Sequence, residues 1–251
     1  MQYDCPQCMV ANRPIEAAWR TAWAIRSAWQ RSGVPDRFRN ATLDNWRPVG
    51  AAQDAVLTAV RAYAESSESA LQSGRGLILL GAVGVGKTHL AVGVTQKVIA
   101  SGHAATFVRV GDLFAAIKRS FNPDAAAFDD ENLRSVQFLI LDDLGASRGT
   151  DWETSVLHDL LAHRYDHRLP TIVTTNESDF DRVVGERIAD RFDENALRLT
   201  IAGTSQRKTA GHRDATTDEA ISEPPKTLTL TYCSSGRMTT RTEKMESRRY
   251  L

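Results

Sequence analysis

The sequence predicts an α/β fold over residues 51–208, with a five-stranded parallel sheet between helices. Two observations carry this prediction. Short apolar runs alternate with segments of helical periodicity, and a glycine-rich loop pattern stands between the first apolar run and a helix. Continuous apolar runs are typical of strands that are buried on both faces. We expect residues 1–50 to form a small helical N-terminal region and residues 209–251 to form a disordered tail.

Each predicted element has its own local signal. The strands are apolar or β-branched runs, which we place at residues 76–80, 104–110, 138–141, 171–175 and 197–201. The helices carry apolar residues at helical spacing, and we place them at residues 87–100, 112–120, 151–167 and 178–192. Pro170 ends the third of these helices, and Ser178 is the expected N-cap of the fourth.

Composition excludes several classes of protein. Apolar residues make up 42% and charged residues 25%, as in an ordinary globular chain, which excludes disorder throughout. No apolar run approaches the roughly 20 residues of a membrane span, and residues 1–10 show no secretory signal. Basic and acidic residues balance at 31 each, so contact with nucleic acid requires a local patch. Three cysteines argue against a disulfide scaffold and for a cytoplasmic protein.

The glycine-rich loop matches the pattern that binds nucleotide phosphates. Glycines permit backbone shapes that aim several N–H groups at one anion, and the following helix adds its positive end. Lys87 is expected to reach the β- and γ-phosphates, and the Thr88 hydroxyl to bind Mg²⁺. The alternative is a simple glycine-rich turn. The predicted ligands are ATP and Mg²⁺, and the nucleotide-binding residues are Gly81, Ala82, Val83, Gly84, Val85, Gly86, Lys87, Thr88 and His89.

Polar residues end two of the later strands. Asp142 and Asp143 follow an apolar strand, which predicts that Asp142 holds the metal and that Asp143 orients or deprotonates the attacking water. The alternative is an acidic turn. Asn176 ends the next strand and would face the γ-phosphate if that strand lies beside the loop-bearing strand. It could instead only cap a turn.

Three arginines near the end of the predicted domain could each be either structural surface residues or functional residues. Arg187 and Arg191 lie four residues apart on one helix face, where they could pair with Glu186 and Asp190 as solvated surface. They could also stabilise charge at the nucleotide of a neighbouring subunit. Arg207, just past the last strand, has the same two readings.

These patterns together resemble the AAA+ ATPases of the DnaC/DnaI helicase-loader and IstB group. The resemblance covers roughly residues 33–208. It rests on the sequences GKTHLA, LDDLG, TTNES, GERIADRF and G-x-S-x-R, and on the preceding segment GVPDRFRNATL. It implies a P-loop AAA+ (ASCE) ATPase domain. It also implies that Asn176 is a first sensor, that Arg191 is an arginine finger acting on the adjacent subunit, and that Arg207 is a second sensor.

The resemblance also implies a function. Such proteins form ATP-dependent oligomers on single-stranded DNA, and either load a replicative DNA helicase or serve a transposase. Residues 35–43 and the N-terminal Cys-x-x-Cys favour a helicase loader over an IstB-like transposition helper. Asp143, in place of the more usual glutamate, leaves open an ATP-switched binding module with little hydrolysis. A small-molecule kinase is disfavoured by Arg191 and Arg207 and by the lack of a recognisable acceptor lid.

DNA contacts are predicted from one helix end and one loop. Lys118 and Arg119 lie between Phe114 and Phe121, so positive charge and aromatic rings meet there. Arg148 follows the Asp-Asp strand in a loop. All three basic residues could instead be solvated surface.

Both ends of the chain carry weaker signals. Residues 15–31 have helical spacing with Trp19 and Trp23, which favours a partner-binding helix over one that packs on the ATPase domain. Cys5 and Cys8 are half a zinc site. We expect no bound zinc, because no second cysteine pair follows them and Cys233 lies in the tail. The tail is rich in Thr, Ser and charge, which predicts disorder.

Overall fold

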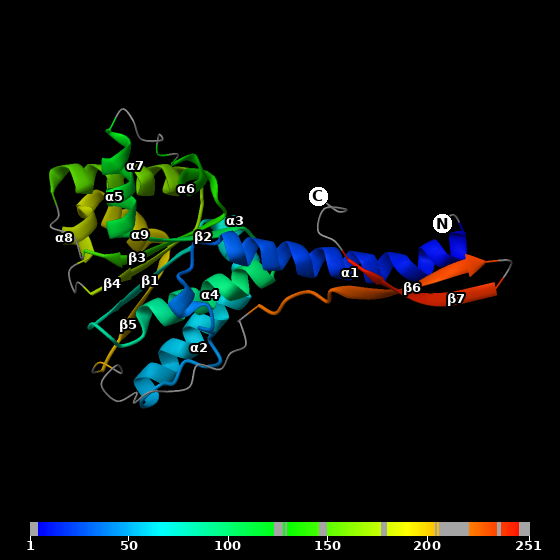
Figure 1. Ribbon diagram of the computed structural model, residues 1–251. Coiled ribbons are helices and arrows are strands. Elements are labelled where there is room, and N and C mark those ends of the chain that lie inside the picture. Colours follow the sequence, from blue (N-terminus) through cyan, green and yellow to red (C-terminus); the bar gives the residue numbers. More distant parts are fainter. Residues whose placement is uncertain are drawn as a thin grey trace. The chain divides into compact units, whose positions relative to one another are not determined.

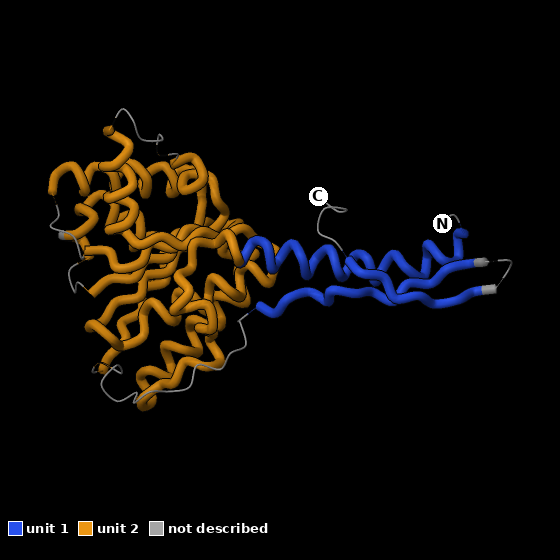
Figure 2. The backbone as a smooth tube through the Cα atoms, in the orientation of Figure 1, with its two compact units in different colours: residues 1–29, 221–251 blue, residues 30–220 orange. Residues whose placement is uncertain are grey.

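The computed structural model describes residues 5–122, 128, 130–145, 150–176, 180–203, 205, 221–234 and 237–245. The chain divides into two compact units, coloured separately in Figure 2. One unit is Gln30–Ala220, and the other joins Met1–Trp29 to Ile221–Leu251. None of the described helices is long and apolar enough to cross a membrane.

The larger unit is built on a five-stranded sheet. Its neighbouring strands pair in parallel in the order β2-β3-β4-β1-β5. The strands are β1 (Gly76–Gly81), β2 (Ala105–Arg109), β3 (Phe138–Leu144), β4 (Thr171–Thr175) and β5 (Ala196–Ile201). The predicted α/β class and five-stranded parallel sheet are therefore confirmed. The order places β4 between β1 and β3, so the carboxyl ends of these three strands meet at one edge.

Helices cover both faces of this sheet. In Figure 1, α2 and α4 lie on one face, while α5, α7 and α9 lie on the other. Leu139 and Leu141 of β3 pack in the same core cluster as Leu113 of α5 and Leu160 of α7. The described helices of this unit are η1 (Asp36–Phe38), α2 (Ala51–Glu65), α3 (Ser67–Ser73), α4 (Lys87–Ala100), α5 (Val110–Ser120), α6 (Glu131–Ser135), α7 (Asp151–Asp166), α8 (Phe180–Val184) and α9 (Glu186–Asn195).

Two differences from the predicted elements have a local cause. The single helix expected at residues 178–192 is divided into α8 and α9 by Gly185, whose φ of +83° lies outside the helical region. The expected cap Ser178 lies outside the described residues. Helices α2 and α3 had no prediction of their own. Tyr63 of α2 is buried and donates to the Arg75 carbonyl (2.8 Å), which ties α2 to the entrance of β1.

The smaller unit corrects the prediction of a disordered tail for residues 221–234 and 237–245. Its β6 (Thr227–Ser234) and β7 (Arg237–Lys244) form an antiparallel hairpin. Leu228 and Leu230 alternate with threonines along β6, and they are buried in one cluster with Trp19 of α1 (Pro6–Arg31). The tail's few apolar residues suffice because α1 covers them. The rest of the expected tail, at residues 209–220, 235–236 and 246–251, lies outside the described residues.

Helix α1 is also longer than expected. The predicted segment began at residue 15, whereas α1 begins at Pro6 and continues through Pro14. Trp19 packs on β6 of the hairpin, an arrangement that neither of the two sequence-based alternatives included.

Candidate nucleotide-binding site

The carboxyl edge of the sheet holds a cavity of about 600 Å³, within the range of ligand sites. Its walls come from the loop after β1, from the ends of β3 and β4, and from the segment before α2. Its lining residues are Arg37, Phe38, Val83, Gly84, Gly86, Lys87, Thr88, His89, Arg109, Asp142, Asp143, Thr174 and Asn176. The strand order thus brings together sequence segments that are up to 139 positions apart, from residue 37 to residue 176.

At two positions of the loop only glycine fits, because the backbone has a positive φ and a neighbouring side chain leaves no room for a Cβ. Gly86 has a φ of +100°, and a Cβ there would lie 2.3 Å from Nε1 of the buried Trp46. Gly84 has a φ of +85°, and a Cβ there would lie 2.2 Å from the Ser205 Oγ. A side chain at either position would push the loop out of its phosphate-binding shape.

Lys87 stands at the first turn of α4 with its ammonium group turned into the loop. Its Nζ donates to the carbonyl oxygens of Gly81 (2.7 Å) and Ala82 (2.8 Å), and to Asn176 Oδ1 (2.6 Å). Asn176 in turn donates from Nδ2 to Asp143 Oδ1 (3.1 Å). Asn176 was expected to face the phosphate site only if its strand lay beside the strand that carries the loop. Strand β4 does lie beside β1, and it brings the Asn176 amide to the loop.

Asp142 is a buried carboxylate that faces the loop. Its Oδ1 accepts hydrogen bonds from Thr88 Oγ1 and Thr174 Oγ1, both at 2.8 Å, and Arg109 Nε lies 3.8 Å from Oδ2. Burial raises the pKa of this carboxyl above its ordinary value, although the two hydroxyls act in the opposite direction. A buried anion beside a threonine hydroxyl is the oxygen donor set that Mg²⁺ prefers, so these residues fit the expected ion.

Thr174 is a site residue that sequence reasoning missed. Besides donating to Asp142, its Oγ1 accepts the backbone N–H of Asp143 (2.9 Å). Asp143 has a φ of +61°, a region that residues other than glycine rarely adopt, and the β3–β4 register shifts between Leu141 and Leu144. The Thr174 hydroxyl therefore holds both acidic residues. The Thr-Thr-Asn ending of β4 was the available signal, but Asn176 alone was singled out.

His89 belongs to the wall of the cavity and also anchors the segment before α2. Its Nε2 lies 2.9 Å from the Thr42 carbonyl oxygen and 2.7 Å from Asn45 Oδ1. Burial lowers the pKa of this imidazole. Next to it, Leu43 covers Gly93 of α4, where a Cβ would lie 2.6 Å from the leucine Cδ2. This packing brings the region of Arg37 and Phe38 to the cavity, which the sequence did not reveal.

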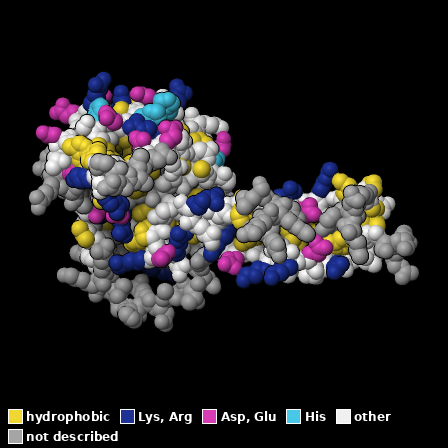
Figure 3. Space-filling view, turned by 45° about the horizontal axis from the view of Figure 1, so that its top comes forward, with side chains coloured by type: hydrophobic (Ala, Val, Ile, Leu, Met, Phe, Trp, Pro, Cys, Tyr) yellow, Lys and Arg dark blue, Asp and Glu magenta, His cyan; other side chains and the backbone are white. Residues whose placement is uncertain are grey.

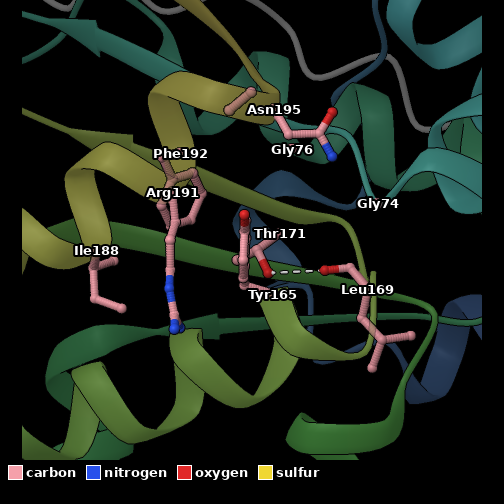
Figure 4. Close-up of a pocket in the computed structure, with 10 residues that line it drawn as sticks. Gly74, Gly76, Tyr165, Leu169, Thr171, Ile188, Arg191, Phe192 and Asn195 are labelled. Atoms are coloured by element: carbon pink, nitrogen blue, oxygen red, sulfur yellow. Dashed lines mark hydrogen bonds between the residues drawn. The ribbon is translucent and has the colours of Figure 1, made fainter.

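The structure places Arg191 away from this cavity. Its guanidinium lies over the Tyr165 ring (4.8 Å to the centroid) and 3.7 Å from Asp166 Oδ1. Figure 4 shows the Arg191 side chain reaching from α9 toward α7. The pocket around it is also lined by the first residue of three strands, namely Gly76 of β1, Thr171 of β4 and Ala196 of β5. Arg191 is thus at the amino edge of the sheet, opposite the loop. Arg187 is exposed on the same helix.

The remaining predicted residues have mixed outcomes. Lys118 Nζ pairs with Glu153 (3.2 Å) and lies over the Trp152 ring, so it has a structural role in its own unit, whereas Arg119 is exposed. Arg148 and Arg207 lie outside the described residues. Ser205 is described, and its Cα would lie 3.2 Å from a Cβ on Gly84, so the chain reaches the loop two residues before Arg207.

Comparisons with known proteins agree with this geometry. Residues 48–213 match a family model described as IstB-like ATP binding protein. The replicative helicase loader DnaC of Escherichia coli (strain K12) is 25% identical over 175 residues, 68% of this chain and 70% of that protein. The insertion sequence IS21 putative ATP-binding protein of Pseudomonas aeruginosa is 31% identical over 153 residues, 58% of this chain and 55% of that protein. A crystal structure of the DnaC helicase loader matches with a TM-score of 0.61 at 28% identity, covering 67% of this chain and all of that one.

Proposed function

Because the chain belongs to the family of IstB-like ATP-binding proteins, we propose that it is an ATP-hydrolysing replicative helicase loader that works as an oligomer on single-stranded DNA. One observation carries the proposal. At a single sheet edge, Lys87 contacts Asn176, Asn176 contacts Asp143, and Asp142 joins Thr88 to Thr174. This is a connected set of cation, metal ligands and water-orienting groups.

Binding of ATP would rearrange contacts that already exist. The Lys87 ammonium would exchange the carbonyls of Gly81 and Ala82 for oxygens of the β- and γ-phosphates. The Thr88 hydroxyl and the Asp142 carboxylate would hold Mg²⁺, Asp142 directly or through water. When bound, that ion neutralises developing negative charge on the phosphates. Release of Lys87 also frees the Asn176 amide to turn toward the γ-phosphate.

Asp143 and Asn176 would carry the hydrolytic step. Asp143 accepts a proton from a water molecule whose oxygen bonds to the γ-phosphorus, while the bond from that phosphorus to the bridging oxygen breaks and ADP leaves with the electron pair. An aspartate reaches less far than a glutamate, and Asp143 is hydrogen-bonded to Asn176. We infer slow turnover until this contact changes, with DNA as the stimulating ligand.

Replacing Asp143 distinguishes a hydrolase from an ATP switch. We expect Asp143→Asn to retain ATP binding but to lose turnover by about 100-fold, as is common for a catalytic base. Asp181→Asn, which changes an exposed aspartate of α8, is the matched control. Turnover should be measured as phosphate release, with and without single-stranded DNA. Equal turnover in both variants and the unmodified protein would contradict the role of Asp143.

The location of Arg191 supports action between subunits. A guanidinium at the amino edge of the sheet cannot reach the nucleotide at the carboxyl edge of the same chain, so a finger at this position requires a second copy. Arg191 would have to leave the Tyr165 ring to act in this way. We propose that ATP-dependent assembly draws it out. Arg207 is the proposed second sensor, because Ser205, two residues before it in the sequence, lies beside Gly84.

Mixing two inactive variants tests the finger. Lys87→Ala lacks a working nucleotide site but keeps its finger, whereas Arg191→Ala keeps the site and lacks the finger. Their mixture should hydrolyse ATP faster than the sum of the two alone, because some sites regain a complete interface. Arg187→Ala is the matched control from the same helix. Recovery by Arg187→Ala with Lys87→Ala, but not by Arg191→Ala with Lys87→Ala, would transfer the role to Arg187.

The proposed DNA contact includes fewer of the residues at the end of α5 than the sequence indicated. On the face drawn in Figure 3, Lys and Arg side chains are interspersed with Asp and Glu, with no single large basic area. Phe121 is 66% exposed beside Arg119, so an aromatic ring and a positive charge face solvent together. We propose Arg119 and Phe121 as the contact, with Arg148 as a further candidate. Lys118 contributes mainly by holding Trp152.

Stimulation by DNA tests this patch. We expect Arg119→Glu to weaken single-stranded DNA binding and the stimulation of turnover by about tenfold or more, because a phosphate contact becomes a repulsion. Lys97→Glu, an exposed lysine near the end of α4, is the control with the same charge change. Basal ATP turnover should stay unchanged in both. Equal effects of the two substitutions would exclude the patch.

The partner decides between the two family functions. The DnaC relatives favour a helicase, whereas the IS21 relative favours a transposase. Within residues 1–50, Val10 and Met9 of α1 are exposed apolar side chains (71% and 43%) and are the proposed partner contact. Light scattering after gel filtration, with ATP and with ADP, should detect a stoichiometric complex with the hexameric helicase from the same genome.

Charge placed on α1 checks the contact itself. Val10→Glu should abolish helicase binding, whereas Ala18→Glu, an exposed position on another side of α1, should not. Circular dichroism, which reports the helix content, serves as the folding control for both. Failure to bind the helicase with either nucleotide would reject the loader, and binding of a transposase instead would establish the transposition helper.

A further inference from the structure

All three cysteines of the chain meet in the smaller unit. Cys5 directly precedes α1, Cys8 lies in the first turn of α1, and Cys233 is near the end of β6. The Cys233 sulfur lies 2.9 Å from the Cys8 sulfur and 3.1 Å from the Cys5 sulfur. The three sulfur atoms all lie within 4.8 Å of one another. This proximity was not predictable from the spacing of the cysteines, because Cys233 lies 225 positions after Cys8.

A specific register brings these sulfurs together. Asn12 pairs with the backbone of Thr231 in both directions, donating to its carbonyl oxygen and accepting its N–H, each at 2.8 Å. Asn12 is four residues from Cys8 on the helix, and Thr231 is two residues from Cys233 on the strand. Each pair therefore shares one face of its element, and the Asn12 contact aligns Cys8 with Cys233. Farther along α1, Trp19 donates to the Pro225 carbonyl (2.8 Å).

The Cys5 sulfur lies at the amino end of α1, close to backbone N–H groups. The backbone N–H groups of Gln7 and Cys8 donate to the Cys5 sulfur. These contacts occur at the first turn of a helix of 26 residues, where unpaired N–H groups and the positive helix end stabilise an anion. Three sulfur atoms that converge in this way form the donor set that a thiophilic cation such as Zn²⁺ prefers.

We propose that Cys5, Cys8 and Cys233 bind one Zn²⁺ ion as thiolates and thereby fasten the hairpin to α1. Zinc–sulfur bonds of about 2.3 Å hold tetrahedral neighbours about 3.8 Å apart. The two short pairs would therefore open by less than about 1 Å around the ion. Among the described residues, no further cysteine, histidine, aspartate or glutamate joins the group, so a water molecule takes the fourth position. Each thiol releases its proton as it binds.

The small core of this unit gives the ion a structural role. Its buried cluster consists of Trp19, Leu228 and Leu230, with Trp23, Tyr232 and Met245 partly buried against it. Units with so little buried apolar surface commonly depend on a metal or on disulfides. A disulfide suits this cluster less well than a metal does, because Cys233 is close to two sulfurs and one thiol would be left over.

Metal analysis of the full chain tests the proposal. Protein purified without chelators should contain about one zinc per chain by mass spectrometry. Cys5→Ser, Cys8→Ser and Cys233→Ser should each retain less than about a tenth of that amount. Met238→Ser, which changes the exposed sulfur paired across the hairpin with Cys233, is the matched control and should retain full zinc. Full zinc in Cys233→Ser would overturn the proposed site.

Two further measurements identify the metal ligands directly and check that the larger unit stays folded. Replacement by Co²⁺ should give the near-ultraviolet sulfur-to-cobalt absorption in the unmodified protein and in Met238→Ser but not in the cysteine variants. ATP binding, which depends on the other unit, should persist in every variant. No zinc in the unmodified protein after reconstitution, or one free thiol and a disulfide in the native chain, would refute the proposal. None of these results depends on the helicase-loader function.

Discussion

The Thr174 hydroxyl offers the sharpest test of how the site is held together. Its substitution by valine keeps the shape of the side chain but removes the donor to Asp142 and the acceptor for the Asp143 N–H. Thr175, the next residue of β4, is the matched control. It is equally buried, and its hydroxyl donates to the Leu144 carbonyl (2.8 Å).

The expected magnitude follows from the kind of hydrogen bond that is lost. A bond to a charged group contributes about 1.5–3 kcal/mol. If this loss falls on the ionised carboxylate that binds Mg²⁺, the metal-dependent affinity or turnover should fall by about 10- to 100-fold. Both Thr174→Val and Thr175→Val leave a buried polar group unpaired, so each should also cost about 1–3 kcal/mol of unfolding free energy.

The assay separates these two effects. ATP turnover is measured against Mg²⁺ concentration at saturating ATP, and stability is measured by urea unfolding without metal. Thr174→Val should need a higher Mg²⁺ concentration for half-maximal turnover, whereas Thr175→Val should be less stable but normal in its Mg²⁺ dependence. An unchanged Mg²⁺ dependence in Thr174→Val, or an equal shift in both variants, would refute the argument.

Three other predictions concern the loop, the core and pH. Gly86→Ala should lower the affinity for a fluorescent ATP analogue by at least about tenfold because its Cβ meets Trp46, whereas Gly102→Ala, also at positive φ but in open space, should only destabilise by about 1 kcal/mol. Arg164→Met should cost about 3 kcal/mol or more in urea unfolding, because this buried guanidinium bonds the carbonyls of Leu133, Val136 and Pro170. Burial raises the pKa of the Asp142 carboxyl in the folded, metal-free protein above its ordinary value of 3.8. The protonated carboxyl therefore contributes stability below pH 3.8, and this contribution is lost as the pH rises through the higher pKa of the folded state. The Asp142→Asn variant should therefore gain stability relative to the unmodified protein over that rise, and a constant difference in urea unfolding would contradict the assigned shift.

The sequence by itself determined the parts of the protein that are local. The loop from Gly81 to Thr88 is contiguous, so its glycines, its lysine and the helix that follows can be recognised without knowing the sheet. The five strands were also predictable, because burial on both faces leaves continuous apolar runs. Asp142 followed from its position at the end of one such run.

Only the tertiary structure decided which distant residues meet. Periodicity reports how each element is buried but not the order of strands, and the placement of β4 between β1 and β3 is what joins Thr174 and Asn176 to the loop. The same reason explains why the hairpin in the tail was not predicted. Two leucines in β6 are too few to predict a fold alone, yet they suffice once α1 covers them and brings Cys233 to Cys5 and Cys8. Contacts between the two ends of a chain depend on packing partners, which no local pattern records.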